Sequence, residues 1–162
     1  RLGAPSATGE RFDRAIRARP RDAGLFGLVV RHLATGLADA SLWRPIDAAA
    51  AELVAIEART RDLASGYARL SPGVAIVDVS ARTGAIDKTL LLLIGQERER
   101  VSVVVDRDTV TVAAGFDSGL NFLEMLGLSG GMPTRVSVGR AELPGLLTAL
   151  GVPATEAAAH LR

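Results

Sequence analysis

The sequence predicts an α/β protein in which amino-terminal helices and a long connector helix precede a small mixed sheet covered by helices. Three observations predict this fold class. Apolar residues recur at helical spacing up to residue 70, runs of β-branched residues follow residue 73, and Ser71, Pro72 and Gly73 interrupt regular structure between them. The expected order after residue 73 is strand, helix, strand, strand, helix, strand and helix, which indicates a mixed sheet.

The composition is that of a folded chain whose net charge is too small to produce a strong electrostatic field. Of 162 residues, 48% are hydrophobic and 23% charged, and the net charge is +1. Any nucleic-acid contact therefore requires a local patch of charge. The absence of cysteine excludes disulfides, thiolate zinc sites and cysteine nucleophiles, and it fits a cytoplasmic protein. No apolar run approaches the ~20 residues of a membrane helix.

Three helices are expected in the amino-terminal part, over residues 10–18, 24–37 and 45–70. In the third, two series at seven-residue spacing form a heptad seam: Ile46, Leu53, Thr60, Tyr67 and Ala49, Ile56, Leu63, Leu70. This seam either packs against the helix at 24–37 or serves as a linker or dimer contact. We expect residues 1–44 to be a helical segment that ends an upstream domain, and residues 45–72 to be a connector helix. A chain that opens with loop-like residues at Arg1 further suggests the carboxy-terminal part of a larger protein.

Residues 73–152 are expected to form the α/β domain, with residues 153–162 as a tail. The short apolar run at 74–79 is typical of a buried strand, and 101–105 with 109–113 predict a hairpin. The remaining elements are helices at 86–94, 119–128 and 141–150 and a strand at 134–138.

The best local candidate for a binding site is the glycine turn before the last strand. The N–H groups of Ser129, Gly130 and Gly131 can approach an anion without interference from a Cβ atom, and Arg135 follows as a phosphate partner. The alternative is a plain helix C-cap and turn.

Other segments carry weaker signals. Residues 84–89 lie between a strand and a helix, as a P-loop does, but Asp87 stands where the second glycine is needed, so a capped helix start is favoured. Five aspartates could be arranged as a carboxylate metal site or could be solvated loop residues: Asp78, Asp87, Asp106, Asp108 and Asp117.

Neither His32 nor His160 has a partner at metal-ligand spacing, and no nucleophile elbow is present. The densest basic cluster could contact phosphates or be a solvated helix face: Arg11, Arg14, Arg17, Arg19 and Arg21. Trp43 and Tyr67 are too few for a stacking platform.

Residues 73–150 resemble the carboxy-terminal DHHA1-type domain of the DHH phosphoesterases. The resemblance lies in the strand at 74–79, the helix after Gly84, the hairpin that leads into Phe116, Asp117, Ser118 and Gly119, and the helix at 121–128 that runs into Ser129, Gly130 and Gly131. In the family this helix runs into several glycines and then a histidine that contacts the phosphate or nucleotide end of the substrate. Here Met132 follows Gly131, so the family's substrate role carries over only to Gly130 and Gly131.

The resemblance implies the substrate-binding half of a divalent-metal-dependent phosphoesterase. It implies that no catalytic residue or metal ligand lies in this chain, and that an amino-terminal domain of the full-length protein holds manganese or another divalent metal. Implied partners are that missing catalytic domain and a short oligonucleotide or phosphorylated small molecule; a homodimer is also possible. The alternative function is a non-enzymatic α/β binding or oligomerisation module. A third hypothesis is an independent hydrolase that uses the region of Asp78 and Asp87.

Overall fold

The computed structural model describes residues 6–36 and 43–160, and it confirms the α/β fold class. Contacts divide the chain into two compact units. We call the described residues 6–36, 43–59 and 85–87 the helical unit, and residues 60–84 and 88–160 the sheet unit.

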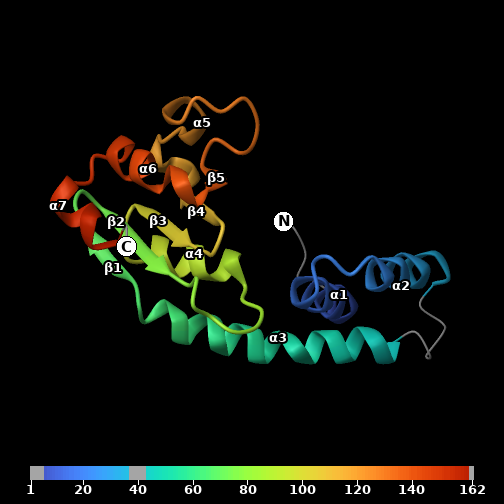
Figure 1. The fold of residues 1–162 in the computed structure, drawn as a ribbon. Coiled ribbons are helices and arrows are strands. Elements are labelled where there is room, and N and C mark those ends of the chain that lie inside the picture. Colours follow the sequence, from blue (N-terminus) through green and yellow to red (C-terminus); the bar gives the residue numbers. More distant parts are fainter. Residues whose placement is uncertain (1–5, 37–42, 161–162) are drawn as a thin grey trace. The chain divides into compact units, whose positions relative to one another are not determined.

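The helical unit contains α1 (Ala7–Ala18), α2 (Ala23–Ala34) and most of α3 (Trp43–Ala64) (Figure 1). Side-chain oxygens of Ser6 and Asp22 cap α1 and α2 by accepting bonds from the amides of Gly9 and Leu25. The first half of the heptad seam packs against both helices. Its residues share two clusters with α1 and α2: Phe12, Ala15, Leu25, Val29, Ile46 and Ala49, and then Ala18, Leu53 and Ile56.

Two helices end earlier than expected. The helix predicted to continue to Leu70 ends at Ala64, and the connector predicted over 45–72 includes strand β1 (Ala68–Leu70). The Ser65 hydroxyl donates to the carbonyl of Asp62 at the end of α3. Strand β1 then forms antiparallel backbone hydrogen bonds with the strand that follows it. The helix predicted over 24–37 ends at Ala34, and residue 37 lies outside the described residues.

His32 lies in an aromatic cage of the helical unit. It is fully buried, its ring centroid is 4.5 Å from that of Trp43 and 6.1 Å from that of Phe12, and neither ring nitrogen has a hydrogen-bond partner among the described residues. A buried polar group without a partner destabilises a fold by roughly 1–3 kcal/mol.

Replacing His32 by leucine is therefore expected to stabilise the helical unit by about 1 kcal/mol, because a side chain of similar size removes two unsatisfied nitrogens. Chemical denaturation of wild type and His32→Leu measures the difference. A lower stability for the variant would show that the imidazole has a partner and contradict this account.

The sheet unit is built on a five-stranded mixed sheet in the order β1, β2 (Val74–Asp78), β3 (Val101–Val105), β4 (Thr109–Ala114), β5 (Arg135–Gly139). Strands β2 and β3 are parallel and the other neighbours are antiparallel, so the predicted hairpin of β3 and β4 is confirmed. The parallel pair is joined by α4 (Lys88–Gln96), as a crossover requires.

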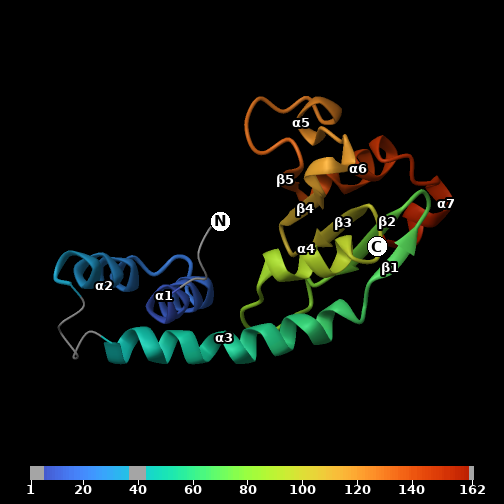
Figure 2. The same ribbon diagram turned by 180° about the vertical axis from the view of Figure 1, so that it is seen from behind.

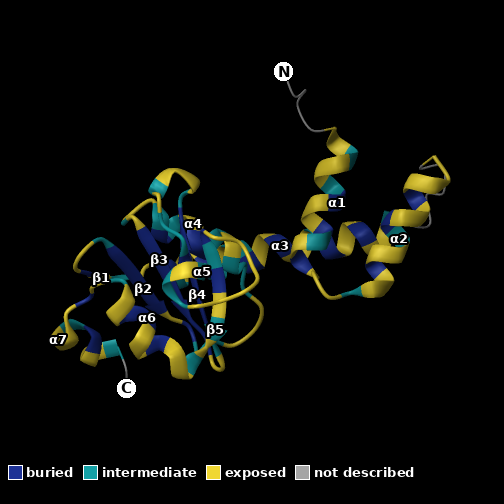
Figure 3. Cartoon of the chain, turned by 90° about the horizontal axis from the view of Figure 1, so that it is seen from above, coloured by how far each residue is buried: buried dark blue, intermediate teal, exposed yellow. Residues whose placement is uncertain are grey.

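Helices cover both faces of this sheet (Figures 1 and 2). Helix α4 contacts β2, β3 and β4 on one face. On the other face, valines of β2 to β5 form the main core with α5 (Phe122–Met125), α6 (Leu143–Ala149) and α7 (Ala154–Ala157). Strand residues are correspondingly the darkest part of the unit in Figure 3.

The structure corrects three further expectations. The helix predicted over 119–128 is reduced to the single turn of α5, which follows a 3-10 turn at Phe116–Ser118. The predicted tail at 153–162 contains α7, where Ala157 is buried in the core and Glu156 accepts a bond from the amide of Ser71. The last predicted helix begins as a 3-10 turn before α6. Over residues 6–36 and 43–160, no helix has both the length and the apolar character needed to cross a membrane.

Candidate functional site

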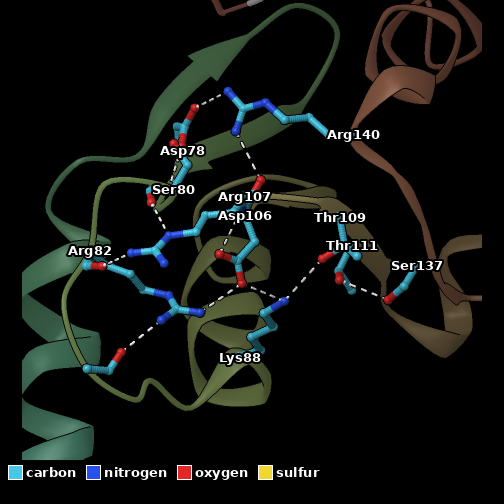
Figure 4. Close-up of polar contacts among 11 residues, drawn as sticks. Asp78, Ser80, Arg82, Lys88, Asp106, Arg107, Thr109, Thr111, Ser137 and Arg140 are labelled. Atoms are coloured by element: carbon cyan, nitrogen blue, oxygen red, sulfur yellow. Dashed lines mark hydrogen bonds and ion pairs between the residues drawn. The ribbon is translucent and has the colours of Figure 1, made fainter.

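Polar side chains gather where the parallel strands β2 and β3 end (Figure 4). Ligands of α/β sheets commonly bind at this edge, outside the carboxyl ends of parallel strands. We call the set Asp78, Arg82, Lys88, Asp106, Arg107 and Arg140 the strand-end cluster.

Asp106 is the centre of the strand-end cluster. It is 8% exposed, and its Oδ2 lies 2.8 Å from Nζ of Lys88 and 2.9 Å from Nη2 of Arg82, while its Oδ1 accepts from the amide of Arg107. Burial alone raises the pKa of a carboxyl group, but these charge-assisted bonds outweigh it and lower the pKa of Asp106 to about 2. The carboxylate is therefore charged at neutral pH.

The other members attach the loop after β2 to the same centre. Arg140 donates to Oδ2 of Asp78 and to the carbonyl of Asp106, each at 3.0 Å. Arg107 donates to the carbonyls of Ser80 and Arg82 at 3.1 and 3.2 Å. Burial opposes ionisation of Asp78, but bonds from Ser80 and Arg140 lower its pKa.

The strand-end cluster carries four cations and two carboxylates, a formal excess of +2 (4 − 2). All six charged groups already bond within the sheet unit. The arrangement therefore fixes the loop between β2 and α4, and its charge excess makes this edge of the sheet attractive to anions.

The glycine bend, residues Ser129, Gly130 and Gly131, lies between α5 and β5. All three residues are exposed, as the exposed colouring of this loop shows in Figure 3. Among the described residues, none of their three amides donates a hydrogen bond. Gly131 has φ +126°, a conformation that other residues rarely adopt, and a Cβ there would lie 3.4 Å from Leu123.

Arg135 opens β5 directly after a tight turn in which its amide donates to the carbonyl of Met132 at 3.0 Å. The backbone of Arg135 is therefore only four residues beyond Gly131. Its guanidinium reaches Thr89 in the first turn of α4, where Nη1 donates to Oγ1 at 3.2 Å. The Arg135 side chain thus lies on the face covered by α4, whereas Gly131 lies near Leu123 on the face covered by α5. The structure therefore does not bring the guanidinium of Arg135 to the glycine bend.

Most of the remaining candidates have structural partners. Within the helical unit, Asp87 forms an ion pair with Arg17 at 2.6 Å. In the sheet unit, Lys88 of the P-loop-like segment forms an ion pair with Asp106. In the basic cluster, Arg11 pairs with Asp47, Arg17 with Glu57, and Arg19 with Glu52. Asp108 and Asp117 are exposed, and no group of three or more His, Asp or Glu that could hold a metal occurs in the described part of the chain.

Sequence reasoning did not identify Arg82, Arg107 and Arg140 as neighbours. One signal for the strand-end cluster was available, because Asp78 and Asp106 each end a β-branched run, and parallel neighbours place such residues together. The arginines gave no such signal, since they come from three separate loops.

No protein-family model, curated protein or solved structure was found to match this chain. The family resemblance consequently rests on the order of elements and on the glycine bend.

Proposed function

We propose that the sheet unit is the phosphate-binding or nucleotide-end-binding half of a DHH-like, metal-dependent phosphoesterase, and that this chain is not catalytic by itself. The observation that carries the proposal is the exposed glycine bend, whose three amides donate no bond within the described residues. Successive amide N–H groups in a turn are a recurring binding site for phosphate oxygens.

The bend has the properties of an anion site rather than of a simple connection. A C-cap turn uses its amides to satisfy the last carbonyls of the helix, and here the amides of Gly127 and Leu128 already do so at Glu124 and Leu123. The amides of the glycine bend therefore remain available for a ligand.

The proposal assigns the chemistry to another part of the protein. A divalent metal, manganese in the family, would be held by an amino-terminal domain and would supply the activated water. This chain would hold the phosphate of a short oligonucleotide or of a phosphorylated small molecule. We place the protein in the cytoplasm, where these substrates are found and where a protein without cysteines needs no oxidising environment.

We predict that the chain binds a 5′-phosphorylated dinucleotide and that Arg135→Gln changes this binding by no more than about twofold, because the guanidinium of Arg135 bonds to Thr89 on the face covered by α4. Gly130→Ala should weaken binding about tenfold, since a methyl group enters the ligand's space; the alanine itself meets no other atom within 4 Å. Isothermal titration calorimetry measures both effects.

Gly145→Ala is the matched control, because a Cβ there also meets nothing within 4 Å and the residue lies on α6. Equal affinities for wild type and Gly130→Ala would overturn the proposal. So would hydrolysis of the dinucleotide by this chain alone in the presence of manganese.

The second candidate is a non-enzymatic association module, and one observation favours it. Phe26, Val30 and Leu33 lie along one side of α2 and are 49%, 58% and 64% exposed. Apolar residues at this spacing are typical of a helix face that meets a partner. A molar-mass measurement by light scattering separates the two: a stable dimer that binds no phosphorylated ligand would favour association.

A further inference from the structure

An exposed aromatic residue leaves the sheet at the same end as the segment that carries the proposed phosphate site. Phe116 is 87% exposed, the largest value among the exposed large hydrophobic residues of the described chain. Leu128 and Met132, which flank the glycine bend, are 36% and 48% exposed. A large apolar side chain so open to water is unusual unless it contacts a ligand or partner.

The backbone around Phe116 is held by several contacts. The amide of Ser118 donates to the carbonyl of Gly115 at 3.1 Å, closing the 3-10 turn, and Ser118 Oγ accepts from the amide of Leu120. Arg100 donates to the carbonyl of Ser118 at 2.5 Å and so brings a cation to the same turn. The ring is thus presented by an ordered turn, which limits the entropy that a ligand must overcome.

Phe116 and the glycine bend leave the sheet at the same end of the β4–β5 pair. The register runs from Thr109 opposite Gly139 to Ala113 opposite Arg135, and Ala114 continues it with a 2.9 Å bond to the carbonyl of Thr134. Phe116 follows two residues after Ala114. The bend precedes Thr134 by three residues and contacts α5, where Leu123 packs on Gly131.

This end of the sheet thus carries both an aromatic side chain and amide donors that have no partner among the described residues. A phosphate group by itself does not stack on an aromatic ring, and an apolar ligand cannot accept hydrogen bonds from the amides. A nucleotide satisfies both, because its base stacks on the ring and its phosphate accepts from the amides.

We propose that Phe116 is a nucleobase-stacking residue, so that the ligand class of the glycine bend is a nucleotide or short oligonucleotide rather than a bare phosphate or phosphorylated polyol. This inference rests on the proposed function.

The test compares two ligands that carry the same phosphates: a 5′-phosphorylated dinucleotide and its abasic counterpart. Phe116→Ala is expected to weaken binding of the dinucleotide about tenfold and to change binding of the abasic ligand less than twofold, because only stacking is lost. Phe116→Trp should restore dinucleotide binding, whereas Phe116→Leu, which keeps an apolar group without a ring, should not.

Leu93→Ala is the matched control, since Leu93 is 52% exposed on α4 of the same unit. The side chain of Phe116 is too exposed to support the fold, so circular dichroism of the variants should match that of wild type. Unchanged dinucleotide binding by Phe116→Ala would overturn the stacking inference and leave the proposed function standing. If neither ligand binds to wild type, the proposed function fails and this inference fails with it.

Discussion

Gly95→Ala is expected to destabilise the sheet unit by about 3 kcal/mol or more. A Cβ at Gly95 would lie 2.1 Å from Oγ of Ser102 and 2.8 Å from Cζ of Tyr67. Ser102 and Tyr67 cannot simply turn away, because their hydroxyls bond to each other at 2.9 Å and Tyr67 also donates to the carbonyl of Leu91. Alanine must therefore push α4 off β3 and break these bonds, so that the cost of overpacking adds to that of the lost hydrogen bonds.

The matched control is again Gly145→Ala on α6, where a methyl group meets nothing within 4 Å. There the same change should stabilise the fold by roughly 0.5–1 kcal/mol, because alanine loses less backbone entropy on folding. Denaturant unfolding measures both. Adding Ser102→Gly to Gly95→Ala should recover part of the loss, since it removes the closest atoms. Similar stabilities for the two alanine variants would contradict the close packing of α4 on β3.

Asp106→Asn is expected to cost about 2–3 kcal/mol of folding stability. The amide cannot balance the charges of Lys88 and Arg82, which are both partly buried and would remain together without a counter-charge. Asp108→Asn is the control, because Asp108 is an exposed carboxylate on the same β3–β4 turn and its change should cost less than about 0.5 kcal/mol. Equal losses for the two variants would show that the strand-end cluster contributes nothing specific.

The same carboxylate predicts a pH dependence. The pKa of Asp106 is about 2 in the folded chain, against 3.8 for the free side chain, so the folded state binds the proton less readily. Its contribution, no more than about 2 kcal/mol, is complete above pH 4 and is lost as the pH falls from 4 toward 2. Asp106→Asn should therefore lose less stability over this interval than wild type does. An equal loss of folding stability in wild type and Asp106→Asn between pH 4 and pH 2 would contradict the assignment of this pH dependence to Asp106.

Much of the fold could be predicted from periodicity, and its failures have local causes. The strands β2, β3, β4 and β5 were predicted within one residue at each end, because β-branched runs between turn residues have few other conformations. Strand β1 was missed because Leu63, Tyr67 and Leu70 continue the heptad phase of α3. The heptad spacing alone does not show that Leu70 pairs with Val74 and lies in the core of the sheet unit.

The candidate site was only partly predictable. Gly130 and Gly131 were found because consecutive glycines are a local signal. The strand-end cluster depends on four segments that meet only in the folded sheet, so no spacing in the sequence brings Arg82, Asp106 and Arg140 together. Phe116 was seen only as part of the family resemblance, although a lone aromatic residue between Gly115 and Gly119 is a signal in itself.

The central claim is that the amides of the glycine bend receive a phosphate, and amide NMR spectroscopy of the labelled chain tests it most directly. On titration with a 5′-phosphorylated dinucleotide, the amide resonances of Ser129, Gly130 and Gly131 should shift saturably, with a common dissociation constant, as each N–H gains an anionic acceptor. Saturable binding that leaves these three resonances in place and moves others would contradict the account.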